Sequence, residues 1–272
     1  MRTILYFLAI SFAGLAGAQP VRAADPTSFF AANTPSSTMK IDHAAWGDVL
    51  ARYIQKTANG INLFAYSKVS NADRQKLKAY LTRLQAISVR DLSQDEQMAF
   101  WINLYNAKTI DVVLDHYPVK SIRDISLGGG FFATGPWKKQ NMIVEGQPLS
   151  LDNVEHDILR KLWREPRVHY AVNCASFSCP NLAAKPFTSK ELEAMLDDGA
   201  SAYVNHPRGV AFQGERLILS EIFSWYRKDF GTTDAEIIAH ISKFAAPKLR
   251  EKLAGIKSID GYAYDWSLND AK

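Results

Sequence analysis

Both cysteines of the chain and one of its histidines lie in a single short stretch. Cys174 and Cys179 follow His169 in RVHYAVNCASFSCP, which spans positions 167–180. A cysteine thiolate is a good nucleophile, and a nearby imidazole both lowers the thiol pKa and accepts its proton. This combination predicts thiol chemistry, with Cys179 or Cys174 as the nucleophile and His169 as the base.

Two further groups are candidates for orienting that base. Glu155 and His156 form an adjacent pair upstream, and we expect His156 near the rim of the site. Asn103 and Asn106 lie three positions apart in an otherwise apolar helical stretch, so they share one helix face. Buried amides need partners, so this face should meet polar backbone or the segment that carries His169. The amides then either line the site and stabilise an oxyanion, or brace neighbouring elements.

Local geometry limits which cysteine can pair with the histidine. The apolar run of residues 168–173 is typical of a short buried strand, in which His169 and Cys174 would point to opposite faces. Pairing would therefore need a bend at the strand end, or Cys179 from the following loop. If a helix begins at Pro180, Cys179 would lie at the positive helix end, which lowers a thiol pKa.

Three less reactive interpretations stay open. In an oxidising compartment, Cys174 and Cys179 can form a disulfide that blocks both nucleophiles. Both cysteines can instead bind zinc with His156 and His169, although their spacing differs from the usual Cys-x-x-Cys of zinc and redox sites. His156 alone can be a structural histidine bonded to a neighbouring carboxylate. The sequence itself predicts no cofactor and no metal.

The elements that position these residues are helices mixed with short hairpins. A capping box at Ser93–Glu96 predicts a helix that runs to about Tyr117, before Pro118. Its sequence is apolar on most faces, so we expect it to be the central, buried helix. Hairpins are predicted about residues 145–146 and 214–215. Further helices are predicted over residues 44–56, 71–86, 151–163, 188–204, 221–229, 234–245 and 248–254.

This mixture lacks the regular alternation of a doubly wound parallel sheet. We therefore predict a single α+β domain over residues 41–270, with the central helix packed on short antiparallel strands and hairpins. Residues 24–40 contain Pro, Ser and Thr without periodicity, and we expect them to form a flexible lead-in.

The N-terminal segment is typical of a secretory signal peptide. Arg2 precedes an uncharged run over residues 4–18, which is short for a membrane-spanning helix of ~20 residues. Small residues predict cleavage after Ala23, which makes residues 1–23 the signal peptide, with cleavage after Ala18 as the alternative. The mature chain is then expected in the periplasm or outside the cell, without a transmembrane segment.

The charge of the chain argues against polyanionic partners. It has 32 Lys and Arg against 28 Asp and Glu in 272 residues, for a formal net charge of +4. Removal of residues 1–23 would take away Arg2 and Arg22, so +4 − 2 leaves +2. Such a balance does not steer binding to nucleic acid or anionic lipid. The expected partner is a small molecule, a peptide or a protein of the cell envelope.

Several motifs together resemble the domain of unknown function 547 family. They are AFWINLYNA at 99–107, YPVKSI at 117–122, LSLDNVEH at 149–156, RVHYAVNCAS at 167–176 and SCP at 178–180. LSEIFSWY at 219–226 and YDWSLN at 264–269 are also similar to that family. The resemblance covers most of the mature chain. The family is defined without a known function. Its pattern includes both cysteines and the two histidines of the quoted motifs, His156 and His169.

The order of elements also invites a comparison of folds. A central helix followed by a strand with a histidine is similar to papain-like and transglutaminase-like folds, in which the helix carries the nucleophilic cysteine. Here the helix carries Trp101, Asn103 and Asn106 instead. The analogy therefore implies a relative whose catalysis is lost or rearranged.

Two hypotheses follow from the sequence. The first is a thiol-dependent hydrolase or acyl/amide transferase that uses a Cys–His pair. The second is a non-catalytic binding or assembly module with a structural disulfide between Cys174 and Cys179. The redox state of the two cysteines distinguishes the hypotheses, because only free thiols can act as nucleophiles.

Overall fold

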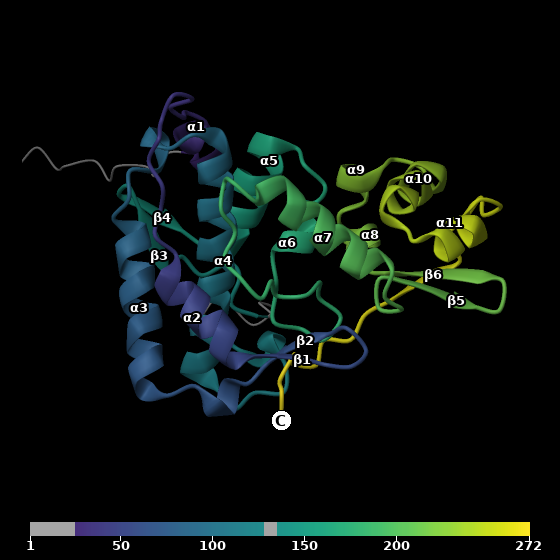
Figure 1. The fold of residues 1–272 in the computed structure, drawn as a ribbon, viewed down its shortest axis with the longest axis horizontal. Coiled ribbons are helices and arrows are strands. Elements are labelled where there is room, and N and C mark those ends of the chain that lie inside the picture. The colour runs from purple at the N-terminus through teal and green to yellow at the C-terminus, as the bar shows by residue number, and fades with distance from the viewer. Residues whose placement is uncertain (1–24, 128–134) are drawn as a thin grey trace, which may run out of the picture.

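The computed structural model describes residues 25–127 and 135–272 (Figure 1). The predicted signal peptide, residues 1–23, and both predicted cleavage points lie outside the described residues. Across the described part of the chain, helices predominate over short strands, and the predicted α+β class is confirmed.

The described residues contain eleven α-helices, three 3₁₀ turns, one π-helical segment and seven strands. The α-helices are α1 (Pro26–Phe30), α2 (Ala44–Tyr53), α3 (Asn71–Gln85), α4 (Gln94–His116), α5 (Arg160–Trp163), α6 (Val168–Ala171), α7 (Leu192–Val204), α8 (Ile222–Trp225), α9 (Arg227–Phe230), α10 (Asp234–Phe244) and α11 (Pro247–Leu253). The 3₁₀ turns are η1 (Tyr66–Lys68), η2 (Val89–Asp91) and η3 (Ile122–Asp124), and the π-helical segment is η4 (Asn153–Leu159). The strands are β1 (Ile54–Lys56), β2 (Asn62–Phe64), β3 (Met142–Val144), β4 (Gln147–Leu149), β5 (Val210–Gln213), β6 (Arg216–Ser220) and β7 (Gly261–Ala263).

The predicted central helix is α4, and most of its residues are buried. The sequence predicted that this helix packs on short strands and hairpins. Its main neighbours in the structure are instead the helical segments α3 and η4. Ser93 is the N-cap residue, but the predicted capping box does not form within the described residues. The Glu96 carboxylate instead accepts a hydrogen bond from the Ile41 amide (2.8 Å), because the preceding chain folds over the helix start.

The strands form three small sheets. β1 pairs with β2 and β3 with β4, in two antiparallel hairpins. β5 and β6 form a third hairpin, and β7 joins it parallel to β6. The predicted hairpins about residues 145–146 and 214–215 are confirmed. At the first of them Glu145 and Gly146 both have positive φ (47° and 75°), as a tight two-residue turn requires.

The segment with His169 is helical, and the predicted strand over residues 168–173 is wrong. Val168–Ala171 form one helical turn, α6, in which the His169 amide bonds the Pro166 carbonyl (3.2 Å). A short apolar run does not distinguish a buried strand from a buried helical turn by periodicity. The chain becomes extended only at Val172, and the loop with both cysteines begins there.

The predicted flexible lead-in contains a short helix that packs on the domain. Asp25 caps α1 through the Ser28 amide, with Pro26 at the first helical position. Phe30 is fully buried, and its ring lies 4.8 Å from that of Trp101 in an edge-on contact. The Asp-Pro cap and the buried phenylalanine explain why this segment does not behave as a linker.

Two hydrophobic clusters meet at α6. One surrounds α4 and includes Val168, while the other lies between α7, α10 and the β5–β6 hairpin and includes Tyr170. Figure 1 shows α2, α3 and α4 on one side of the molecule, and α9, α10 and α11 with β5 and β6 on the other. α6 and α7 lie between them, so this junction positions the site.

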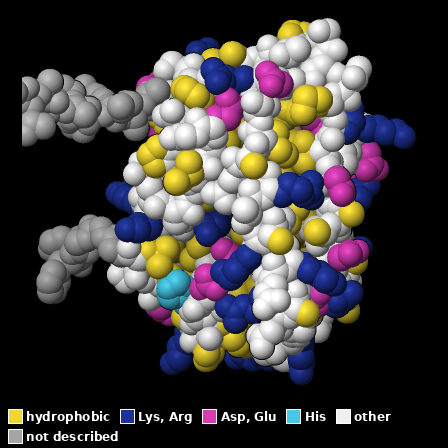
Figure 2. All heavy atoms as spheres, turned by 90° about the vertical axis from the view of Figure 1, so that its left-hand side faces the viewer, with side chains coloured by type: hydrophobic (Ala, Val, Ile, Leu, Met, Phe, Trp, Pro, Cys, Tyr) yellow, Lys and Arg dark blue, Asp and Glu magenta, His cyan; other side chains and the backbone are white. Residues whose placement is uncertain are grey.

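The surface carries both signs of charge. On the face shown in Figure 2, Lys and Arg side chains lie next to Asp and Glu side chains, without a broad field of one sign. Among the described helices, none combines the length and the apolar character that a membrane crossing requires.

Candidate functional site

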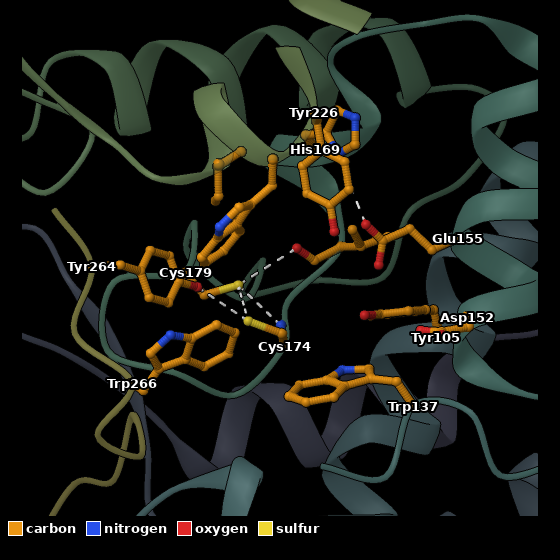
Figure 3. A pocket seen from close by; sticks show the side chains of 13 residues that line it. Tyr105, Trp137, Asp152, Glu155, His169, Cys174, Cys179, Tyr226, Tyr264 and Trp266 are labelled. Atoms are coloured by element: carbon orange, nitrogen blue, oxygen red, sulfur yellow. Dashed lines mark hydrogen bonds and ion pairs between the residues drawn. The ribbon is translucent and has the colours of Figure 1, made fainter. Parts of the chain in front are cut away.

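A cavity of about 240 Å³ opens where the two hydrophobic clusters meet (Figure 3). Its polar and reactive lining comes from three places: Asp152 and Glu155 around the start of η4, His169 from α6, and Cys174 with Cys179 from the following loop. Aromatic side chains close the remaining walls, namely Tyr105, Trp137, Trp225, Tyr226, Tyr264 and Trp266.

The turn that presents Cys174 is fixed by its neighbours. Asn173 donates to the Pro180 carbonyl (2.6 Å) and accepts from the Ala175 amide (2.9 Å), so its side chain clamps both ends of the loop. Ala175 has a φ of 60°, in the left-handed region that non-glycine residues seldom occupy. Such strain persists only where the surroundings enforce it, and it is common at functional sites. The Cys174 thiol is thus held at a turn with little freedom.

The two cysteines are free thiols in contact with each other. Their Sγ atoms lie 3.0 Å apart, and the Cys174 amide donates to Cys179 Sγ (3.0 Å). Cys174 Sγ also lies 3.2 Å from Ser176 Oγ and 3.3 Å from the Tyr264 hydroxyl, which bond each other at 2.6 Å. Hydrogen bonds from Cys179, Ser176 and Tyr264 outweigh burial and lower the pKa of Cys174 to about 7.

Cys179 has the opposite electrostatic character. It is buried, its sulfur lies 3.9 Å from the Val172 carbonyl oxygen, and burial together with the neighbouring Cys174 raises its pKa. The predicted helix start at Pro180 is absent, because residues 180–187 are irregular in the structure. The expectation of a lowered Cys179 pKa is therefore wrong, and Cys174 is the thiol that ionises more readily.

His169 contacts carboxylates. Its Nε2 lies 2.7 Å from Asp229 Oδ2, and its ring stacks on Tyr226 at a centroid distance of 4.1 Å. Nδ1 lies 3.9 Å from Glu155 Oε1 and has no hydrogen-bond partner in the described part of the chain. Among the described residues, neither ring nitrogen forms a hydrogen bond with a sulfur atom. The predicted Cys–His contact is therefore not formed in this structure.

The carboxylate below His169 is shared with an arginine. Arg160 binds both oxygens of Asp229, at 2.5 and 3.1 Å. Burial opposes ionisation of Asp229, but the hydrogen bonds from His169 and Arg160 hold its pKa well below the usual range. Burial lowers the pKa of His169, although the bond to Asp229 opposes the effect. The neutral imidazole therefore donates from Nε2 to Asp229 and keeps Nδ1 as an acceptor.

The acidic wall is built on an irregular helix. Ser150 caps its start through the Asn153 amide (3.1 Å), and η4 follows as a π-helical segment, a rare form that often occurs at functional sites. Burial raises the pKa of Asp152, and the charge of Glu155 adds to the effect. His156 lies at the rim: its ring faces Arg160 (Nδ1–Nη1 3.2 Å), and it lines a shallow neighbouring hollow.

The amides of α4 brace the site from behind. Asn106 donates to the Ala171 carbonyl (2.9 Å) and accepts from the Asn173 amide (2.8 Å), which ties α4 to the cysteine loop. Asn103 exchanges two hydrogen bonds with the Phe187 backbone and does not reach that loop. The sequence predicted that this face meets polar backbone or the His/Cys segment, and Asn103 does the former while Asn106 does the latter. Of the two roles that the sequence allowed, oxyanion stabilisation and bracing of neighbouring elements, the hydrogen bonds of both amides have the geometry of bracing.

Several site residues were not singled out from the sequence. Asp229 orients His169, and Tyr264 and Ser176 contact Cys174. Tyr264 and Asp229 lie far from the cysteines along the chain, so spacing gave no sign of them. The aromatic-rich motifs at 219–226 and 264–269 were the available signal, because clustered Trp and Tyr are enriched at binding sites. No group of three or more His, Cys, Asp or Glu side chains in the described ranges is arranged to hold a metal, so zinc gains no support.

Comparison with protein families assigns the central part of the chain. Residues 89–204 match the model described as "Protein of unknown function, DUF547". This segment belongs to the DUF547 family. The DUF547 segment contains Glu155, His169 and both cysteines, while the aromatic wall at 225–226 and 264–266 follows it in the chain. No curated protein and no solved structure matches the chain.

Proposed function

We propose that this protein is an exported thiol-dependent hydrolase or acyl/amide transferase in which Cys174 is the nucleophile. One observation carries the proposal. The Cys174 sulfur borders a cavity and is held by Cys179, Ser176 and Tyr264, which together lower its pKa to about 7. A thiol with such a pKa is substantially ionised near neutral pH without a histidine on the sulfur. Export rests on the N-terminal sequence.

The reaction would proceed through a thioester. The Cys174 thiolate attacks an acyl carbon, and the carbonyl electron pair moves onto oxygen. Collapse of this intermediate breaks the bond to the leaving group, which takes a proton from an acid in the cavity. Water or an amine then attacks the thioester and gives its proton to the conjugate base of that acid, and Cys174 leaves as thiolate.

The acidic wall supplies candidates for this proton transfer. Asp152 is a candidate donor, because it lines the cavity, and burial together with the charge of Glu155 raises its pKa. His169 is suited to accept a proton at Nδ1, since Asp229 fixes the tautomer with the proton on Nε2. In this arrangement the imidazole relays the proton of the water or amine to the conjugate base of Asp152, so it assists the second step and does not activate the thiol.

The experiment measures turnover of an activated acyl ester, p-nitrophenyl acetate, with and without an amine acceptor. Cys174→Ala should abolish turnover. Cys179→Ala is the matched control: it should retain turnover above pH 8 but lose activity near pH 6, because one hydrogen-bond donor to the thiolate is gone. Equal activity of Cys174→Ala and the wild type would refute the proposal.

A second candidate function is a binding module stabilised by a Cys174–Cys179 disulfide. It is favoured by the 3.0 Å distance between the two sulfur atoms. A disulfide oxidant could take two electrons from this pair, and both thiols would lose their protons as the Cys174–Cys179 bond forms. Intact mass after alkylation, with and without reductant, decides between the candidates in protein isolated from the native envelope. Two alkylated thiols without reductant support the enzyme, and an unreactive bridged pair supports the module. N-terminal sequencing of the same sample tests export, with a start at Ala24 or Gln19 expected.

A further inference from the structure

The wall of the cavity beside Cys174 is a group of packed aromatic rings. Tyr264 lies 4.7 Å from Trp266 and 4.8 Å from Trp225, measured between ring centroids, and the two tryptophans stack at 5.3 Å. Trp137 meets Trp266 edge-on at 5.9 Å. Figure 3 shows Tyr264, Trp266 and Trp137 around the sulfurs. The faces of such rings carry negative potential and attract cations.

The opposite wall is acidic. Asp152 and Glu155 line the cavity, and among the described residues its lining includes neither lysine nor arginine. Two guanidinium groups contact the rings of the wall: Arg123 lies 5.2 Å from the Trp266 ring centroid, and Arg160, 4.8 Å from that of Tyr226, is bound to both oxygens of Asp229. Figure 3 shows both carboxylates across the cavity from Tyr264 and Trp266. A ligand between these walls therefore meets two carboxyl groups on one side and aromatic rings on the other.

The histidine adds a further acceptor to the acidic wall. His169 is 1% exposed at its side chain, and its Nδ1 lacks a hydrogen-bond partner within the described ranges. Because Nε2 donates to Asp229, Nδ1 of the neutral ring has a lone pair and no proton. A buried acceptor without a donor is costly, so the site is short of an N–H or O–H group that a ligand would bring.

We propose, building on the proposed thiol chemistry, that the site selects substrates with a protonated amine close to the reacting acyl group. The aromatic wall and the two carboxylates would hold the ammonium group, and its N–H bonds would satisfy carboxylate oxygens and His169 Nδ1. An anionic substrate would face repulsion from Asp152 and Glu155.

The experiment uses Cys174 itself as the reporter and requires no substrate. Three methanethiosulfonates differ in charge: 2-aminoethyl (cationic), propyl (neutral and of the same size as 2-aminoethyl) and 2-sulfonatoethyl (anionic). In each case the Cys174 thiolate attacks the sulfenyl sulfur, the bond between the two sulfurs breaks, and methanesulfinate leaves. Rates are measured on the reduced full-length protein by peptide mass spectrometry and divided by the rates with free cysteine. The mixed disulfide and any internal disulfide formed from it with Cys179 are counted together.

The cationic reagent should react at least about tenfold faster than the neutral one after this correction, and the anionic one about tenfold slower. Asp152→Asn and Glu155→Gln should each reduce the cationic preference severalfold. Asp157→Asn is the matched control: it removes a carboxylate of the same helical segment that pairs with Lys161 outside the cavity, and the preference should not change. A 2-trimethylammonioethyl reagent, which lacks N–H groups, should lose part of the advantage.

The two proposals fail in different ways. If Cys174 reacts readily but without a cationic preference, or if the preference survives in Asp152→Asn and Glu155→Gln, the ammonium site is refuted while the nucleophile stands. If Cys174 is inert toward all reagents in the reduced protein, the nucleophile is refuted, and the ammonium proposal falls with it.

Discussion

Replacement of Tyr264 by phenylalanine is a direct test of how Cys174 is activated. The change removes one hydroxyl, which lies 3.3 Å from Cys174 Sγ and 2.6 Å from Ser176 Oγ, and keeps the ring that packs on Trp266. The variant should fold normally, because the aromatic contacts survive. Its thiol should, however, lose both a direct donor and the partner that orients Ser176.

The magnitude follows from the pKa itself. The pKa of Cys174 falls from an ordinary 9.0 to about 7, although burial acts in the opposite direction. Two pKa units correspond to about 3 kcal/mol of net stabilisation of the thiolate, which two donors share: Cys179 and the hydrogen-bonded pair of Ser176 and Tyr264. Loss of one donor should therefore raise the pKa by about one unit. At pH 6 the thiolate population, and with it the alkylation rate, should fall by close to tenfold.

The assay is the pH dependence of Cys174 alkylation by iodoacetamide, with modification of the peptide followed by mass spectrometry. The midpoint should lie near pH 7 in the wild type and near pH 8 in Tyr264→Phe. Tyr262→Phe is the matched control, since the Tyr262 hydroxyl accepts from Arg227 at 3.4 Å and has no part in the thiol group. A wild-type midpoint near 9, or an unchanged midpoint in Tyr264→Phe, would refute the reasoning.

Three further predictions concern the core, the pH dependence of stability and the histidine. Trp101→Ala should lower the free energy of unfolding in urea by ~3–5 kcal/mol, because the indole is fully buried, and a loss well under 1 kcal/mol would show that α4 is not the core helix. Burial lowers the pKa of both His43 and His240 from 6.5 to about 4. Between pH 4 and pH 6.5 the unfolded chain therefore binds more protons than the folded chain. The free energy of unfolding should decrease as the pH falls from 6.5 toward 4, by up to about 3 kcal/mol per histidine. In His43→Gln the free energy of unfolding should depend less steeply on pH. Asp229→Asn should reduce turnover and leave the pH midpoint of Cys174 alkylation unchanged, because the Asp229 carboxylate binds His169 and not a sulfur atom. A shifted midpoint would contradict the conclusion that His169 with Asp229 and the thiol group of Cys174 act independently.

The central helix could be predicted from the sequence, because burial on most faces leaves a clear apolar pattern over its length. The amides of that helix were also informative. A mid-helix asparagine on an apolar face needs a partner, and Asn106 finds it in the backbone on either side of Val172. The spacing indicated that such a contact exists, but it could not indicate whether the amide catalyses or braces.

The contacts of the reactive groups could not be derived from local pattern. Residues 168–171 form a helical turn, because their backbone bonds are set by the preceding residues Glu165, Pro166 and Arg167. That turn directs His169 toward Asp229, which lies 60 positions away in the chain. Such long-range pairings depend on tertiary packing, and periodicity within one segment contains no information about them.

The most direct test of the account is to trap an acyl group on the protein. Reduced protein is mixed with p-nitrophenyl acetate, quenched in acid within the first turnover and digested for peptide mass spectrometry. The account predicts acetyl thioester on Cys174, formed with a pH midpoint near 7 and still formed in Cys179→Ala. An acetyl group found only on Cys179, or the absence of any cysteine adduct while both thiols are reduced, would contradict it.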